Sequence, residues 1–229
     1  MSERSYGQYC PIAHALDLVG DRWALLIVRD LFLGPKRYTD LRDALPGTGS
    51  NILAARLKAL EGAGIVARRA LPPPAASTVY ELTPHGRGLE GVITALGHWG
   101  ERSLGARRPG QIVSAESLML AGRALFAALA PALGMVRAEL RIADAAFDGA
   151  FGVRIDGGSV VDVTRAPAPA PAPPPDLTVR TDVETLYAMA AGRITLSDAV
   201  AAGLVDLKGA PEVVVAVGGC AASPADASV

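Results

Sequence analysis

The stretch Gly49–Gly64, GSNILAARLKALEGAG, constrains the fold of this chain more than any other. Leu53, Leu57 and Leu60 follow one another at i, i+4 and i+7, which places them on one stripe of a helix that must be buried. The other side carries small, amide or basic side chains and no acid before Glu61. A helix that enters the DNA major groove needs such a face, because its residues approach base edges and phosphates. A surface helix of an alanine-rich protein has the same pattern, so this helix alone favours neither interpretation.

Shorter helix patterns precede this stretch. Pro11–Val19 is one, and Arg22–Leu33 is a second with Asp21 as its expected N-cap. Thr39 is the expected cap of a third over Asp40–Leu45. Two helices joined by a tight turn that contains glycine form a helix-turn-helix arrangement, so the third and fourth patterns predict one.

Two β-strand patterns follow the helices, at Ile65–Ala70 and Val79–Leu82. The linking sequence LPPPAAST is too rich in proline for a two-residue hairpin, so we expect a projecting loop. A strand, a projecting loop and a second strand after a helix-turn-helix make a winged helix. Arg68 and Arg69 should point to opposite faces of their strand, so at least one could reach phosphate. A solvated strand edge is the alternative for this pair.

The predicted DNA contacts combine this helix with basic side chains around it. Formal charge is +4 over residues 1–110 and −5 over residues 111–229, which suits one domain that faces a polyanion and one that does not. The candidate DNA-binding residues are Ser50, Asn51, Ala54, Ala55, Arg56, Lys58, Lys36, Arg37, Arg68 and Arg69.

Thr83-Pro84 is expected to open a long helix over His85–Leu104. This helix is too apolar to stand alone. A homodimer interface would cover it, since reading two DNA half-sites requires two copies. Packing against the second domain would cover it equally well.

The order of these features closely resembles the HxlR-type winged helix-turn-helix transcriptional regulators over roughly residues 6–104. The resemblance implies a dimeric regulator that binds a double-stranded DNA operator, with Asn51 and its neighbours in the major groove. It is carried by Cys10-Pro11, Gly20-Asp21-Arg22-Trp23, Gly34-Pro35-Lys36-Arg37-Tyr38, Leu45-Pro46-Gly47, Asn51, Arg56-Leu57, Gly64-Ile65-Val66, Tyr80-Glu81-Leu82-Thr83 and Trp99-Gly100.

Cys10 has two interpretations. Some relatives use a cysteine at this position to sense oxidants or electrophiles, which requires an exposed thiolate of low pKa. A structural cysteine at the start of a helix is the alternative that we favour. The other cysteine is Cys220, near the opposite end, so there is no disulfide framework or zinc spacing. This usage fits a reducing cytoplasm.

Gly105–Gly110 has the composition of a hinge and marks the predicted domain boundary. The expected organisation is a DNA-binding and dimerisation domain over 1–107, a second domain over 111–218 and a tail over 219–229. The second domain should begin with an apolar helix, Val113–Leu129. Strands are expected at Val136–Ile142, Gly152–Ile155 and Val160–Thr164, with a hairpin at Gly157-Gly158 and a polyproline-type connector over Ala166–Pro175.

The remaining sequence predicts a strand at Leu177–Arg180, a helix capped by Asp182, a helix from Ser197 and a strand at Val205–Lys208. This spacing is similar to the sterol carrier protein fold, an α/β sandwich around an apolar tunnel, over about Ser114–Val217. That fold closes with a helix after Gly209, whereas the β-branched residues of Glu212–Val217 prefer a strand. The candidate tunnel residues are Leu118, Phe126, Phe147, Phe151, Leu186 and Met189.

The sequence thus predicts an α+β chain with an N-terminal winged helix-turn-helix domain and a sterol-carrier-protein-like second domain. We expect a cytoplasmic transcriptional regulator controlled by a hydrophobic small molecule, with no membrane partner. The alternatives are a regulator whose second domain only dimerises or docks a protein, and a carrier of an apolar metabolite. Three scattered histidines and the absence of a phosphate-cradling glycine loop predict no catalytic site, metal site or cofactor.

Overall fold

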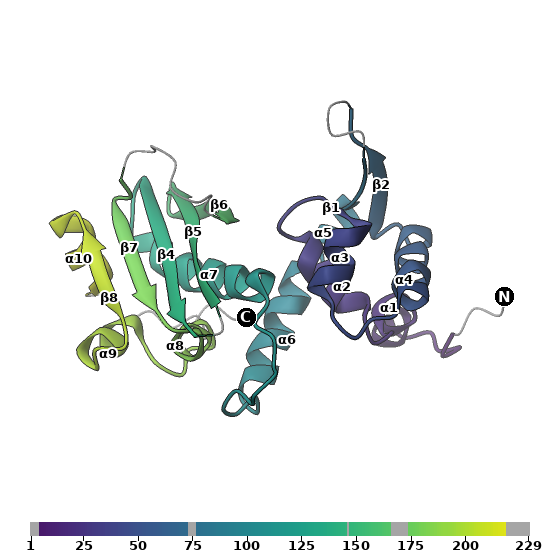
Figure 1. Cartoon of the computed structure of the whole chain (residues 1–229), viewed down its shortest axis with the longest axis horizontal. Coiled ribbons are helices and arrows are strands. Elements are labelled where there is room, and N and C mark those ends of the chain that lie inside the picture. The colour runs from purple at the N-terminus through teal and green to yellow at the C-terminus, as the bar shows by residue number, and fades with distance from the viewer. Residues whose placement is uncertain (1–4, 73–76, 146, 166–173, 219–229) are drawn as a thin grey trace. The chain divides into compact units, whose positions relative to one another are not determined.

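The computed structural model describes residues 5–72, 77–145, 147–165 and 174–218, which fall into two compact units (Figure 1). The first unit ends at Ile93 and the second begins at Thr94. Most of the wing loop, most of the proline-rich connector and the whole tail from residue 219, with Cys220, lie outside the described residues.

The first unit is a helical domain with a small antiparallel sheet whose strand order is β1-β3-β2. The structure confirms the four predicted helices and both wing strands. It adds the two-residue strand β1, which is too short to leave a sequence pattern. The elements are α1 (Pro11–Val19), α2 (Ala24–Leu31), β1 (Lys36–Arg37), α3 (Tyr38–Ala44), α4 (Ser50–Gly62), β2 (Val66–Ala70), β3 (Thr78–Leu82), α5 (Pro84–Arg87) and the start of α6 (Glu90–Glu101).

The predicted leucine stripe of α4 lies at the centre of this unit. Leu53, Leu57 and Leu60 are almost completely buried in a cluster that includes Ile27 and Leu31 of α2. Each such side chain contributes roughly 1.5–3 kcal/mol of transfer free energy when it is buried. The burial of one side of α4 therefore fixes which side faces outward.

Two predicted helix caps are wrong. Trp23 occupies the N-cap position of α2, and Asp21 instead forms an ion pair with Arg56. Helix α3 begins at Tyr38, one residue before the predicted cap Thr39. The carboxylate of Asp40 accepts a hydrogen bond from the backbone N–H of Arg37 at 2.8 Å, which closes this helix start in place of a threonine hydroxyl.

The long helix predicted over 85–104 is interrupted. Thr83 caps a single helical turn, α5, by accepting a hydrogen bond from the N–H of Gly86 at 3.1 Å. A Cβ atom at Gly86 would lie only 2.1 Å from the carbonyl oxygen of Ile65, so this turn is pressed against the end of the wing sheet. The chain then passes through Gly88, the C-cap of α5, before α6 starts at Glu90.

The second unit is built on a five-stranded sheet of order β6-β5-β4-β7-β8, in which only β4 and β7 are parallel. Gly157 and Gly158 have φ values of 57° and 74°, so they form the predicted hairpin turn between β5 and β6. The elements are α7 (Ala115–Leu129), a 3₁₀ turn (Ala130–Ala132), β4 (Val136–Asp144), β5 (Phe147–Asp156), β6 (Ser159–Arg165), β7 (Leu177–Thr181), α8 (Val183–Ala190), α9 (Leu196–Ala201), β8 (Asp206–Gly209) and α10 (Pro211–Gly218).

Helices α7 and α8 cover one face of this sheet (Figure 1). Along β4, Val136, Ala138 and Leu140 are buried, whereas Arg137 and Arg141 are exposed on the other face. The helix α7 approaches β4 closely, since a Cβ atom at Gly122 would lie 2.6 Å from Leu140 Cδ2. Within the described residues, the result is a two-layer α/β unit whose second sheet face carries exposed side chains such as Arg137 and Arg141.

The caps of the second unit confirm one prediction and correct another. Asp182 caps α8 by accepting a hydrogen bond from the N–H of Thr185 at 2.7 Å. The helix predicted to start at Ser197 starts one residue earlier, at Leu196, because the side chain of Thr195 caps α9 by accepting a hydrogen bond from the N–H of Asp198.

The strand predicted at Glu212–Val217 is wrong, because this segment is the helix α10. Pro211 provides a first helical turn with its fixed φ, and the carbonyl of Ala210 accepts from the N–H groups of Val213 and Val214 at 3.0 Å. Val217 is fully buried, and the helix packs against α9 and β8. Tertiary packing therefore outweighs the β preference of the valines.

One segment, Ala115–Ala132, is long and apolar enough to cross a membrane, with a mean hydropathy of 1.2. This is weak support for a membrane span, because 44% of the segment is buried within the protein. Its apolar side chains are those of α7, which pack on the sheet.

Candidate nucleic-acid interface

The outward side of α4 is free of acidic side chains over its first three turns. Asn51, Ala54, Ala55 and Lys58 are exposed, while the stripe of leucines is buried. Among the described residues, Lys58 has no ion-pair partner. A face of this kind presents one amide, one cation and small side chains, so a double helix could approach its backbone closely.

The start of α4 is held by a contact from α3. The hydroxyl of Tyr38 donates a hydrogen bond to the carbonyl oxygen of Ser50 at 2.7 Å. The turn before α4 contains Gly47 at a φ of 87°, a conformation that favours glycine. Ser50 is exposed at this end of the helix. In the sequence, Tyr38 was noted only as part of the motif Gly34-Pro35-Lys36-Arg37-Tyr38, and no pattern showed that it positions the next helix.

Arg56 does not share the open face of α4. Its side chain is 28% exposed and forms an ion pair with Asp21, which lies just before α2. Arg56 and Ile52 therefore lie on the flank of α4 that faces the junction between α1 and α2. The predicted phosphate contact by Arg56 requires that it leave or share Asp21.

The wing strands β2 and β3 pair in antiparallel register. Of the two arginines on β2, Arg69 forms an ion pair with Glu81 and Arg68 does not. Arg69 donates to both carboxylate oxygens of Glu81, with each nitrogen–oxygen distance at 2.9 Å. This pairing lowers the pKa of Glu81 and raises that of Arg69, chiefly through the hydrogen bonds. Arg68 is exposed and has no ion-pair partner in the described parts of the chain. Of the two wing arginines, Arg68 is therefore the one open to phosphate.

Lys36 and Arg37 form β1, which pairs with β3. Arg37 is exposed and Lys36 is half-buried. These two residues therefore belong to the small sheet as well as to the approach to α3. Strand β1 places two cations on one edge of this sheet, and β2, which carries Arg68, forms the opposite edge.

Replacing Glu81 by glutamine should release Arg69 to bind DNA. The folded-state pKa of Glu81 is lowered, so the ion pair is intact at neutral pH and is lost only as pH falls through that lowered pKa. With one more phosphate contact, the slope of log K against log salt should steepen by roughly 0.9. Fluorescence anisotropy with a duplex at several salt concentrations measures the slope. The matched control is Asp206→Asn, which removes an exposed ion pair with Lys208 in the second unit, and an unchanged slope for Glu81→Gln would contradict the prediction.

Comparison with known proteins identifies the family of the first unit. The sequence profile described as HxlR-like helix-turn-helix matches residues 18–108. The HTH-type transcriptional regulator YodB of Bacillus subtilis is 36% identical over 94 residues, which are 41% of this chain and 84% of that protein. The chain belongs to the HxlR-like helix-turn-helix family.

Two further similarities involve the same kind of protein. The HTH-type transcriptional regulator sll1512 of Synechocystis is 40% identical over 90 residues, covering 39% of this chain and 67% of that protein. The solved structure of the reduced form of YodB from B. subtilis aligns with 45% of this chain and 100% of its own, at 34% identity and a TM-score of 0.38. As a member of this family, the chain is a DNA-binding transcriptional regulator. The profile covers residues 18–108, so most of α1 and the whole of the second unit from α7 onward lie outside it.

Cys10 stands at the N-cap position of α1 and is half-buried. Its carbonyl oxygen accepts a hydrogen bond from the N–H of His14 at 2.9 Å. This position fits the structural role that the sequence analysis favoured. A redox role for Cys10 stays a prediction.

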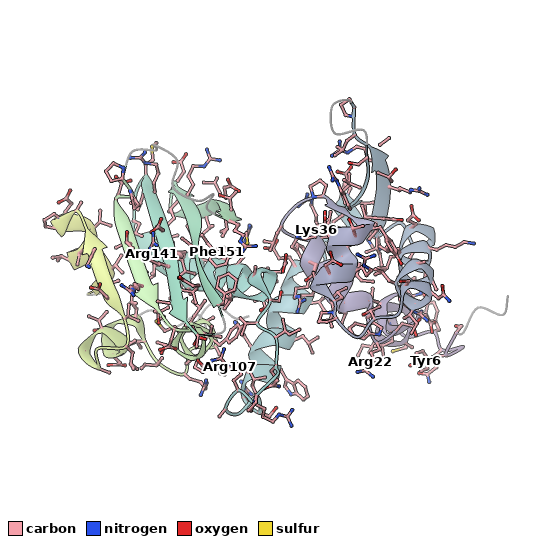
Figure 2. All side chains as sticks on the ribbon, in the orientation of Figure 1. Tyr6, Arg22, Lys36, Arg107, Arg141 and Phe151 are labelled. Carbon is pink, nitrogen blue, oxygen red and sulfur yellow. The ribbon has the colours of Figure 1, made fainter. Side chains whose placement is uncertain are left out.

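The candidate tunnel residues of the second unit form its core. Leu118, Phe126, Phe151, Leu186 and Met189 are each exposed by 1% or less. Phe147 is half-buried and stacks on Phe151, with ring centroids 5.7 Å apart, and Arg165 lies over the Phe147 ring (Figure 2 labels Phe151). A water-sized void beside the five buried side chains would leave them measurable exposed area, so they are packed against protein atoms. The likeness to a sterol carrier protein and its tunnel stays a prediction.

Proposed function

We propose that α4 is the recognition helix of this regulator and that its open face, centred on Asn51, Ala55 and Lys58, reads base edges in the major groove. The observation that carries this proposal is the combination of a leucine stripe buried in the core with an opposite face that is exposed and free of acids. Ser50 and Ala54 border this face, and Arg68 and Arg37 supply cations for the phosphate backbone on the wing side, with Lys36 next to Arg37 on β1. Arg56 and Arg69 contribute only after they exchange Asp21 and Glu81 for phosphate.

Asn51→Ala and Lys58→Ala should weaken DNA binding in different ways. The amide of asparagine can make a bidentate contact with adenine, so Asn51→Ala should lose about 1–3 kcal/mol of discrimination for the preferred operator. Lys58→Ala should weaken binding to all duplexes and reduce the salt slope by about 1. The measurement is anisotropy with an operator duplex, recovered by selection from randomised DNA, and with a scrambled duplex.

The matched control for both variants is Lys208→Ala, which removes an exposed cation from the second unit and should leave DNA binding unchanged. If Asn51→Ala kept the full preference for the operator and Lys58→Ala kept the salt slope, α4 would not be the recognition helix.

We further propose that the chain acts as a homodimer in the cytoplasm and that α6 contributes to the interface. Val92, Leu96 and Trp99 are spaced at i, i+4 and i+7, and they are exposed by 51%, 47% and 68%. An exposed stripe of large apolar side chains is typical of an interaction surface. A second copy fits this surface because a two-fold dimer can read two half-sites.

Trp99→Glu should convert the dimer to a monomer at micromolar concentration, because it places a charge in the middle of an apolar interface. Sedimentation velocity gives the molecular mass directly. Val215→Glu is the control, since Val215 is an exposed apolar residue on the helix α10, and it should leave the mass unchanged. A Trp99→Glu variant that remains dimeric would place the interface elsewhere.

For the second unit, control by a hydrophobic small molecule is the proposal that the predicted fold supports. A different function, dimerisation or docking of a protein partner, is favoured by the burial of Leu118, Phe126 and Leu186 and by the close approach of Gly122 to Leu140. A ligand would have to part α7 from the sheet. Native mass spectrometry of freshly purified protein, before and after incubation with a cell lipid extract, separates the two functions. Bound small-molecule mass supports the sensor, and a protein that stays empty supports the docking module.

A further inference from the structure

A concave site of about 390 Å³ lies in the first unit beside the recognition helix. Its walls come from the residues before α2, from the turn that leads into α4 and from the flank of α4. The lining residues are Asp21, Arg22, Trp23, Gly47, Ile52 and Arg56.

The charged groups of this site favour an anion. Arg22 and Arg56 contribute two positive charges and Asp21 one negative charge, so the lining carries a net charge of +1. Arg56 already binds a carboxylate, that of Asp21, which shows that its guanidinium is placed for such a partner. Arg22 is exposed on the surface of the first unit (Figure 2), and none of the described carboxylates pairs with it. A ligand carboxylate would therefore find one unpaired and one exchangeable guanidinium.

The remaining walls favour a flat, apolar ligand body. The guanidinium of Arg22 stacks over the Trp23 ring at 5.4 Å from its centroid, and a guanidinium plane stacks equally on an aromatic ligand. Trp23 is half-buried and lies next to the turn, with its Cη2 atom 3.9 Å from where a Cβ of Gly47 would be. Ile52 is 47% exposed although it is a large aliphatic residue, which leaves an apolar surface for a ligand to cover.

We propose that this site binds a small aromatic monocarboxylate. The carboxylate pairs with Arg22 and competes with Asp21 for Arg56, and the ring lies against Trp23 and Ile52. The inference does not depend on the predicted tunnel of the second unit, because every lining residue belongs to the first unit. It also does not depend on DNA binding, because occupancy is measured on the protein alone.

The test is a titration of the full-length protein with benzoate, followed by ligand-observed NMR, with benzyl alcohol as the uncharged counterpart. We expect saturable benzoate binding that weakens about tenfold or more in Arg22→Gln, because a hydrogen-bonded charge partner is lost. Arg22→Lys keeps the charge and should recover part of the affinity. Arg68→Gln, which removes an exposed arginine of the wing, should leave the benzoate affinity unchanged, and benzyl alcohol should bind at least about tenfold more weakly than benzoate.

Two results would overturn the proposal. One is that benzoate does not bind, or that Arg22→Gln leaves its affinity unchanged. Binding that does not depend on Arg22 would belong to another site. The other is a role in DNA binding only. In that case Arg22→Gln leaves the benzoate affinity unchanged but reduces the salt slope of operator binding by about 1, as the loss of a phosphate contact would. Loss of operator binding in Asn51→Ala bears on the recognition helix alone, so the two accounts fail separately.

Discussion

Leu57→Ala is expected to lower the free energy of unfolding of the first unit by about 2–5 kcal/mol, the usual cost of truncating a buried leucine. Leu57 is 1% exposed and lies between Leu53 and Leu60 in the cluster that holds α4 against α2. The truncation leaves a cavity under α4, the proposed recognition helix, so DNA binding should be lost at temperatures where the second unit is still folded. Hydrogen exchange resolved by segment, over a denaturant series, measures the stability of each unit.

The matched control is Lys58→Ala, the exposed neighbour on the same helix, which should change the free energy of unfolding by less than about 0.5 kcal/mol. A Leu57→Ala protein with unchanged protection in residues 24–62 would show that α4 is not held by its leucine stripe.

Phe126→Ala is expected to lower the free energy of unfolding of the second unit by about 3–5 kcal/mol. Phe126 is fully buried on α7, beneath the five-stranded sheet. Operator affinity should be retained under conditions where the first unit stays folded, because the proposed DNA contacts all belong to that unit. The exposed neighbour Ala127 provides the control, since Ala127→Ser should leave the stability of the second unit within about 0.5 kcal/mol.

The two truncations together test the division of labour between the units. If Phe126→Ala abolished DNA binding while protection in the first unit was intact, the second unit would take part in DNA binding. If Leu57→Ala and Phe126→Ala each lowered the stability of both units, the chain would unfold as one cooperative body.

The sequence predicted those elements whose pattern is local. The leucine spacing identified α4 and its buried side, and the glycine pair identified the hairpin between β5 and β6. The alternation along β4 gave a strand of the right position, although it extends two residues further. These patterns depend only on the period of a helix or strand, so a single sequence carries them.

The features that the sequence did not predict depend on contacts between distant residues. Strand β1 exists only because β3 offers it an edge, and α10 is a helix because it packs on α9 and β8. The close approach of Gly86 to the backbone of Ile65, in the turn where the predicted long helix is interrupted, is also a contact between distant residues. Composition and periodicity do not contain such information.

The candidate site shows the same division. The exposed face of α4 was predicted from the leucine spacing, which buries the other side, and the structure leaves Asn51, Ala54, Ala55 and Lys58 open to solvent. The partners of Arg56 and Arg69 were not predicted, because each ion pair joins residues that are far apart in the chain. For Arg69, the sequence did contain a usable signal. If the two predicted strands are paired in antiparallel register, Arg69 and Glu81 fall on the same face of the sheet.

Selection of bound duplexes from a randomised DNA pool by the full-length protein tests the central claim most directly. We predict an enriched motif with two inverted half-sites, whose centres are about one helical turn (10–10.5 base pairs) or a multiple of it apart. The same selection with Asn51→Ala should lose the preference at one base position in each half-site. A folded, dimeric protein that enriches no motif over the input pool would contradict the account.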